Sequence, residues 1–229
     1  TKNLFFDLNA NRDFVHIDDI CKSINLIIRN HFTKPINISS GRKNSLIDIV
    51  KINEDLKQAQ QMQKKGYLPL AISILQNLCT QSPQRVILWN TLGYYQQRNK
   101  QLEESINSFN QALKIDSNFI DSLNNKGLSL LLLHNIEKSK TYFTQAVNID
   151  PNNPLVIRNI GIYYSATNQL KKAKTYFKKA IKINPNADLV YFYYGIYLLQ
   201  TNNQKEAIDH LKISASFGEV EAQNKLLKL

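Results

Sequence analysis

A period of 34 residues runs through most of this 229-residue chain and limits the folds that it can adopt. Small residues recur at this spacing, and they are Ala59, Gly93, Gly127, Gly161 and Gly195. Sixteen residues after each of them stands a large apolar residue, and these are Leu75, Phe109, Phe143, Phe177 and Leu211. A fixed period of this length is typical of proteins in which each repeat is one small supersecondary unit. Such a chain buries its apolar surface by stacking each repeat on the next.

The apolar spacing within each repeat predicts two antiparallel helices. In the fourth repeat, Ala173, Phe177 and Ala180 lie at helical spacing and form one apolar stripe. The glycine on the preceding helix lets this second helix approach closely. Pro151 and Pro185 stand where a second helix ends, because a proline cannot extend it. We therefore predict a mainly α protein, a right-handed α-solenoid of about five helix pairs.

The array of five repeats resembles the tetratricopeptide repeat family, whose pattern is W-x2-L-G-x2-Y, then A-x3-F, then P. The second repeat carries Trp89, Leu92, Gly93, Phe109 and Ala112. The fourth carries Gly161, Tyr164, Ala173, Phe177, Ala180 and Pro185. The units are phased as 52–85, 86–119, 120–153, 154–187 and 188–221, followed by a capping helix at 222–229. The resemblance implies a scaffold over 52–229 that binds a protein or peptide partner.

Residues 1–51 do not share the period and predict a short, incomplete α/β segment. Apolar strands and helical stretches alternate there in the order β-α-β-α, and Ser45 with Asp48 forms a capping box that begins a helix. The stretches 12–28 and 35–52 resemble the substrate-side half of NAD-dependent epimerases and dehydratases of the extended short-chain dehydrogenase family. This resemblance implies that Arg12 contacts a phosphate of a nucleotide-sugar, which suits a bidentate guanidinium.

The family's Gly-rich dinucleotide fingerprint and Tyr-x-x-x-Lys pair are absent from this chain upstream of Arg12. We expect that the chain alone is not an enzyme and holds no cofactor, and that NAD enters only if an upstream half exists. Because the chain begins at Thr1 and its one methionine is Met62, we expect it to be part of a longer protein. Either an epimerase half lies upstream and the repeats are its C-terminal appendage, or residues 1–51 are a remnant joined to a repeat protein. A third alternative joins the repeats to a glycosyl- or sulfo-transfer domain, which such solenoids often serve.

Composition excludes several other classes of protein. The net charge is +11, but 23 of the 29 basic residues are lysines, whereas specific readers of nucleic acids rely on arginine, so a nucleic-acid partner is not expected. Cys21 and Cys79 lie far apart and predict a reducing, cytoplasmic location. The longest apolar run, 189–199, is shorter than the ~20 residues of a membrane span. The four histidines are scattered, so we expect neither a metal site nor a catalytic residue.

The first helix of each repeat is expected to line a concave peptide-binding face. The residues expected there are Asn90, Tyr94, Arg98, Asn124, Asn125, Leu128, Arg158, Asn159, Ile162, Phe192 and Ile196. By resemblance, Asn125 and Asn159 take the place where some family members hold a peptide backbone, since an amide side chain both donates and accepts. The apolar residues could instead pack within the superhelix.

A cluster of six lysines lies on the second helix of the fourth repeat. These are Lys171, Lys172, Lys174, Lys178, Lys179 and Lys182. They surround a buried stripe, so they are expected on the convex side as a solvated face. The alternative is a patch that attracts an acidic protein, nucleic acid or membrane surface. No feature of the sequence predicts an oligomeric state.

Overall fold

The computed structural model describes residues 46–186 and 188–229, which form eleven helices and no strand. The chain divides between Lys51 and Ile52 into two units; α2 begins in the first unit, and all the other helices described belong to the second. The helices are α2 (Leu46–Lys64), α3 (Leu68–Gln81), α4 (Val86–Arg98), α5 (Leu102–Ile115), α6 (Ile120–Leu132), α7 (Ile136–Ile149), α8 (Pro154–Ala166), α9 (Leu170–Ile183), α10 (Asp188–Gln200), α11 (Gln204–Ser216) and α12 (Val220–Leu226).

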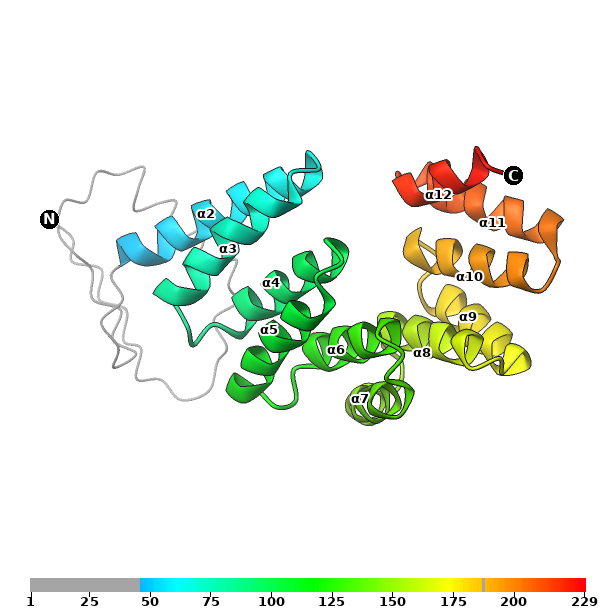
Figure 1. Ribbon diagram of the computed structural model, residues 1–229, viewed down its shortest axis with the longest axis horizontal. Helices are drawn as coiled ribbons and strands as arrows, with labels where there is room; N and C mark the ends of the chain where they lie inside the picture. Colours follow the sequence, from blue (N-terminus) through cyan, green and yellow to red (C-terminus); the bar gives the residue numbers. More distant parts are fainter. Residues whose placement is uncertain (1–45, 187) are drawn as a thin grey trace, which may run out of the picture. The chain divides into compact units, whose positions relative to one another are not determined.

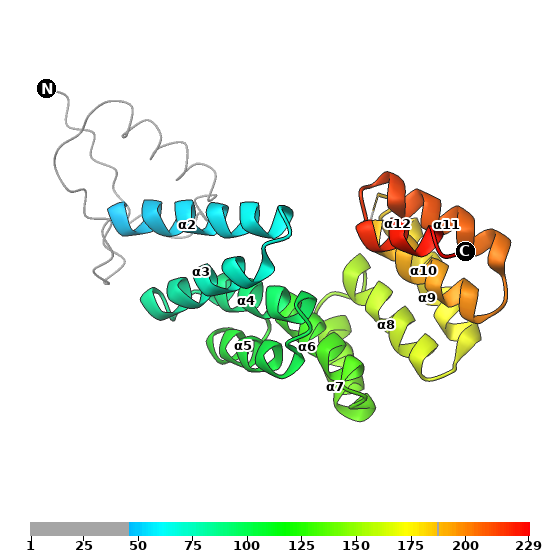
Figure 2. The ribbon, with the colours of Figure 1, turned by 45° about the horizontal axis from the view of Figure 1, so that its top comes forward.

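Consecutive helices pack as pairs, and the pairs follow one another in chain order (Figures 1 and 2). The tightest packing is between α4 and α5, α6 and α7, α8 and α9, and α10 and α11. The first helices of neighbouring pairs also touch: α4 contacts α6, α6 contacts α8, and α8 contacts α10. These four helices therefore form one continuous layer, which we call the inner layer. This arrangement confirms the mainly α solenoid of helix pairs predicted from the 34-residue period.

The recurring glycine is the point of closest approach within each pair. A Cβ atom added to Gly93 would lie 2.6 Å from Cε1 of Phe109, and one added to Gly161 would lie 2.9 Å from Cδ1 of Phe177. Both distances are shorter than the ~3.5–4.0 Å of an ordinary carbon contact. The predicted role of glycine, to let a large side chain on the second helix come close, is confirmed.

The turn inside each helix pair places one residue in the left-handed backbone region. These residues recur with the same 34-residue period and are Gly66, Lys100, His134, Asn168 and Asn202, with φ between +57° and +85°. In each turn the next residue donates its backbone N–H five residues back, as Gln101 does to the oxygen of Gln96. This is the hydrogen bond of a Schellman C-cap, and it reverses the chain sharply enough for the second helix to lie against the first.

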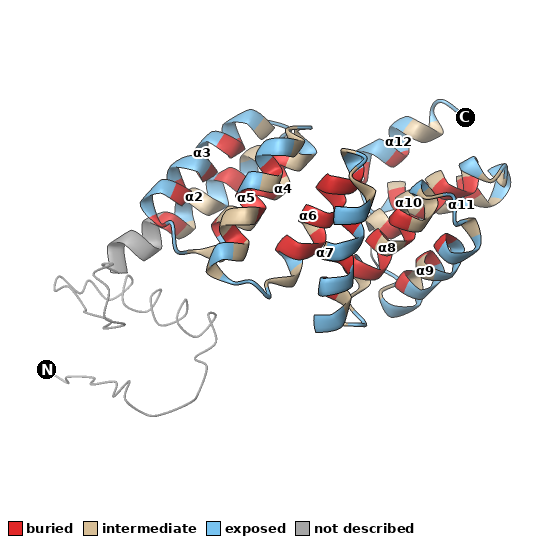
Figure 3. Ribbon diagram, turned by 60° about the horizontal axis from the view of Figure 1, so that its bottom comes forward, coloured by how far each residue is buried: buried red, intermediate tan, exposed pale blue. Residues whose placement is uncertain are grey.

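The core lies between the paired helices, as the buried ribbon segments in Figure 3 show. In α9, burial is confined to Ala173, Phe177 and Ala180, while all six lysines of that helix are exposed. The ring of Phe177 stacks on Tyr194 of the next pair with 5.5 Å between ring centroids. One aromatic side chain thus joins two neighbouring repeats, which is how each repeat buries the apolar surface of the last.

One helix runs through the predicted start of the first repeat. The sequence separated a helix starting at Ser45 from a repeat starting at residue 52, but α2 is one continuous helix from Leu46 to Lys64. Neither glycine nor proline interrupts this stretch, so nothing in it ends the helix. The other elements predicted for the N-terminal segment lie outside the described residues.

Candidate functional site

Polar side chains connect neighbouring helices of the inner layer. The side-chain amide of Gln97 on α4 donates to the backbone oxygen of Asn125 at 3.0 Å and to the hydroxyl of Ser129 at 2.8 Å, both on α6. Ser122 on α6 donates to the side-chain oxygen of Asn90 on α4 at 3.0 Å. Ser165 on α8 likewise donates to Gln200 on α10 at 2.8 Å. The inner layer is therefore fixed by directional bonds as well as by apolar packing.

The most buried of these bonds lie between α6 and α8. Asn159 has no exposed surface, and its amide donates to the side-chain oxygen of Asn124 at 3.0 Å. Arg158 in turn donates from Nε to the side-chain oxygen of Asn159 at 2.9 Å. Burying these groups costs little only because each is hydrogen-bonded. The three residues hold neighbouring inner helices together.

A group of arginine, tyrosine and glutamate side chains lies beside this network. The guanidinium carbon of Arg158 on α8 lies 5.7 Å from the ring centroid of Tyr193 on α10, within the range of a cation–π interaction. Arg98, at the end of α4, donates to the hydroxyl of Tyr94 at 3.4 Å. Its other terminal nitrogen lies 3.4 Å from a carboxylate oxygen of Glu221 on α12. We call Tyr94, Arg98, Arg158, Tyr193 and Glu221 the arginine–tyrosine cluster.

The electrostatics join these side chains into one site. Burial is the largest effect on the Tyr193 phenol and raises its pKa. The nearby Tyr94 and Glu219 also raise this pKa, whereas the positive charges of Arg158 and Arg98 lower it. The pKa of Glu221 is lowered, chiefly by a hydrogen bond with Glu219, against the opposing effect of burial and with a further contribution from Arg98. Groups from α4, α8, α10 and α12 thus act on one another, although up to 123 residues separate them in the chain.

The repeats match a family model described as tetratricopeptide repeat. One such model matches residues 86–119, 120–153 and 159–187, and a second matches residues 176–209. The chain belongs to the tetratricopeptide repeat family. Repeats of this family generally serve as scaffolds for protein interactions and are typically non-enzymatic. No curated protein matches the sequence.

Solved tetratricopeptide repeat structures share the fold at low sequence identity. The protein TTC0263 of Thermus thermophilus superposes with a TM-score of 0.69 at 11% identity, covering 77% of this chain and 97% of that one. PilW, a type IV pilus biogenesis factor, gives 0.59 at 21% identity, covering 73% and 78%. PilF of Pseudomonas aeruginosa gives 0.56 at 19% identity, covering 72% and 76%. At these identities the likeness establishes the fold alone.

The structure divides the predicted groove residues of this tetratricopeptide repeat array into two groups. Four are buried, and these are Asn124, Leu128, Arg158 and Asn159. Leu128 packs in an apolar cluster with Phe143 and Tyr163, and the other three bond to one another. Seven retain exposed surface, and these are Asn90, Tyr94, Arg98, Asn125, Ile162, Phe192 and Ile196. The ladder role predicted for Asn159 is not supported, because its amide is enclosed and bonded within the chain.

Sequence reasoning missed three participants of the inner surface. Tyr193, Glu219 and Glu221 were all placed in the fifth unit, 188–221, but none of them was predicted to lie at a binding surface. The equivalence of Tyr193 with Asn125 and Asn159 at multiples of 34 residues would have placed it on the inner layer. No signal in one sequence pairs Glu221 with Arg98. Arg12, predicted to contact a phosphate, lies outside the described residues.

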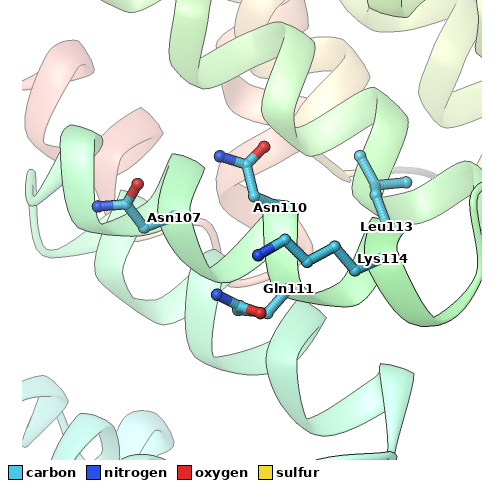
Figure 4. A pocket seen from close by; sticks show the side chains of 5 residues that line it. All are labelled: Asn107, Asn110, Gln111, Leu113 and Lys114. Carbon is cyan, nitrogen blue, oxygen red and sulfur yellow. The ribbon is translucent and has the colours of Figure 1, made fainter.

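Two shallow depressions lie beside α5, away from the arginine–tyrosine cluster. One of about 410 Å³ lies along α5 and is lined by Asn107, Asn110, Gln111, Leu113 and Lys114 (Figure 4). A second of about 510 Å³ lies between α5 and α7, where the ammonium of Lys126 sits 4.0 Å from the ring centroid of Tyr142. Both are open to solvent and are lined by polar and apolar side chains alike, unlike the mostly apolar clefts that hold small molecules.

Within the described residues, no group of three or more His, Cys, Asp or Glu side chains could hold a metal ion. His210, the best-enclosed histidine there, stands 3.9 Å from Glu206 and packs on Tyr194 with 4.6 Å between ring centroids. Burial lowers the pKa of its imidazole. Among the helices of residues 46–229, none is both long and apolar enough for a membrane span.

Proposed function

We propose that this tetratricopeptide repeat array binds a peptide segment of a partner protein along its inner layer. One observation carries the proposal: α4, α6, α8 and α10 contact one another in turn and present partly exposed polar and apolar side chains on neighbouring helices. A surface with this mixture suits a peptide, because its polar groups can form hydrogen bonds with the peptide backbone and its apolar groups can pack against the peptide's side chains.

The polar part of the surface centres on Asn90 and Asn125. Both are partly exposed, and the amide of Asn125 lies 3.5 Å from the side-chain oxygen of Asn90. At this length the hydrogen bond is weak, so little free energy is lost when a bound peptide takes the place of one of the two partners. The two asparagines thus offer donors and acceptors to an extended chain. In this proposal Asn125 binds the peptide backbone, as predicted from the sequence. Asn90 is its partner in this role, in place of Asn159.

The apolar part lies on the later repeats. Phe192 and Ile196 on α10 and Ile162 on α8 are partly exposed. The ring of Phe192 meets Tyr193 edge-on, with 5.2 Å between centroids, which fixes its orientation. An oriented aromatic side chain contributes contact area to a ligand without first losing much rotational freedom.

Selection from a random library of displayed peptides on the full 229-residue chain tests the proposal, followed by measurement of the selected peptides by fluorescence anisotropy. We expect Asn125→Ala and Phe192→Ala each to weaken the selected peptides by about tenfold, the loss of ~1–1.5 kcal/mol in binding free energy. Asn107→Ala is the matched control, because Asn107 is exposed on α5 outside the inner layer.

Peptides that bind equally well to all the inner-layer variants and to wild type would refute the proposal. Loss of binding in Asn107→Ala, with the inner-layer variants unaffected, would refute it as well and would move the site to the outer helices. The urea midpoint of each variant shows whether a loss of binding reflects a loss of folding.

The second candidate function is the C-terminal part of a nucleotide-sugar epimerase or dehydratase that carries these repeats. It is supported by the resemblance of residues 12–28 and 35–52 to that family. Reading the upstream coding sequence tests it directly. A Gly-rich fingerprint after a first strand, with a later Tyr-x-x-x-Lys, would support the enzyme, and their absence would remove it.

A further inference from the structure

The partner's chemistry can be inferred from the charges of the inner layer. Beyond their first turns, α4, α6, α8 and α10 carry three charged side chains, all cationic: Arg98, Lys126 and Arg158. Lys126 is engaged by Tyr142 of α7, on the side of the outer helices. Of the two arginines in the arginine–tyrosine cluster, Arg158 is buried, whereas Arg98 keeps exposed surface. The inner layer therefore presents the guanidinium of Arg98 beside the hydroxyl of Tyr94.

The carboxylate that meets Arg98 comes from another part of the array. Glu221 lies on α12, which packs against α11 after the last helix pair. A single nitrogen–oxygen pair at 3.4 Å joins it to Arg98, although a guanidinium and a carboxylate are able to form two parallel hydrogen bonds. The side chains of Arg98 and Glu221 are 31% and 54% exposed. This is a solvated, one-point ion pair that a better-placed carboxylate can replace.

We propose that the inner layer binds an acidic peptide whose carboxylate takes the place of Glu221 on Arg98, so that α12 competes with the partner. The proposal rests on the proposed function and specifies its ligand. Tyr94 contributes a hydroxyl beside the guanidinium, and Tyr193 presents a ring that Arg158 orients. An acidic side chain flanked by an apolar one fits this surface.

The strength of the competition follows from the exposure of the pair. Exposed ion pairs contribute little, so removing Glu221 should strengthen an acidic ligand by about two- to fivefold and no more. The same substitution should leave a neutral ligand of equal length unaffected, because such a ligand does not compete for Arg98. Removing Arg98 should weaken the acidic ligand and abolish the effect of Glu221.

Fluorescence anisotropy with two labelled decapeptides, (Ser-Glu)5 and its neutral match (Ser-Gln)5, tests this on the full chain at low salt. We expect Glu221→Gln to tighten (Ser-Glu)5 by about two- to fivefold and Arg98→Gln to weaken it several-fold. In the double variant, the effect of Glu221→Gln should vanish. Glu104→Gln is the matched control, since Glu104 is an exposed glutamate on α5 and its loss changes the net charge equally.

Equal tightening by Glu104→Gln and Glu221→Gln would overturn the inference, since net charge alone would then explain both. Tightening by Glu221→Gln that persists in the Arg98→Gln background would also overturn it. If Arg98→Gln weakens the peptide but Glu221→Gln changes nothing, competition by α12 is refuted while the inner-layer site stands. If Arg98→Gln leaves the affinity unchanged and Lys178→Gln abolishes binding, the peptide binds to the exposed face of α9. That result would refute both the inner-layer site and the inference.

Discussion

Replacing Gly93 by alanine is predicted to destabilise the array, although alanine is the better helix former. The added Cβ would stand 2.6, 2.8 and 3.0 Å from three ring carbons of Phe109. Phe109 has no exposed surface, so its ring cannot move toward solvent. One of the two side chains, or the helix that carries it, has to shift by ~1 Å to restore an ordinary carbon contact.

The size of the effect is the difference between two opposing terms. Overpacking a core costs about 1–3 kcal/mol, and the short distances place Gly93→Ala in the upper part of that range. Alanine in place of glycine within a helix stabilises the folded state by about 1 kcal/mol through its higher helix propensity. The free energy of unfolding should therefore fall by about 1–2 kcal/mol.

The first repeat indicates which second substitution should relieve the clash. The first repeat carries Ala59 and Leu75 where the second carries Gly93 and Phe109, and both Ala59 and Leu75 are fully buried. Phe109→Leu should therefore relieve the clash of Gly93→Ala, and the double variant should be more stable than the sum of the single effects predicts.

Urea unfolding followed by circular dichroism measures these differences, with the fluorescence of Trp89 on α4 as a local probe. A midpoint for Gly93→Ala at or above that of wild type would refute the packing argument. So would strict additivity with Phe109→Leu, because it would mean that the two side chains do not meet.

Four further predictions concern other parts of the array. Lys100→Gly should raise the free energy of unfolding by about 0.5–1 kcal/mol in urea titrations, since Lys100 adopts a φ of +64° that glycine tolerates better. Asn159→Ala should lower it by about 1–3 kcal/mol, because the buried partners of its amide lose their hydrogen bonds. Because burial lowers the pKa of His210, the unfolded chain binds the extra proton first, so stability should fall as the pH drops below about 6.5, and the fall should be smaller in His210→Phe. Burial raises the pKa of Cys79 to about 12, so in a Cys21→Ser background its thiol should resist maleimide until urea unfolds the chain.

The helix pairs and their close contact could be predicted from the sequence because they repeat. Gly161 and Phe177 belong to a pattern that occurs in several units, so one misleading residue does not hide it. The left-handed turn residues recur with the same period but were missed. Lys100 and His134 share no chemistry with Gly66, and what they share is a backbone conformation imposed by the helices on either side.

The inner surface was predicted only in part, because burial on a curved stack depends on several repeats at once. Asn125 and Asn159 occupy equivalent positions, yet Asn125 is partly exposed and Asn159 is enclosed. The difference arises from Asn124 and Arg158, whose side chains bond to Asn159. The ion pair between Arg98 and Glu221 joins residues 123 positions apart and has no counterpart elsewhere in the pattern of the described residues.

Binding specificity in this array should therefore depend on the inner-layer residues that do not recur at the 34-residue spacing. The residues equivalent to Arg98 in the next three repeats are Leu132, Ala166 and Gln200, so the guanidinium belongs to one repeat. A change at a periodic position alters how two helices pack, and its effect appears in stability. A change at Arg98 removes a group exposed to a partner and should leave the stack nearly as stable as before, because an exposed ion pair contributes little. Variants that lower affinity without lowering the urea midpoint should consequently fall among the aperiodic inner positions, and the periodic glycines and phenylalanines should show the opposite behaviour.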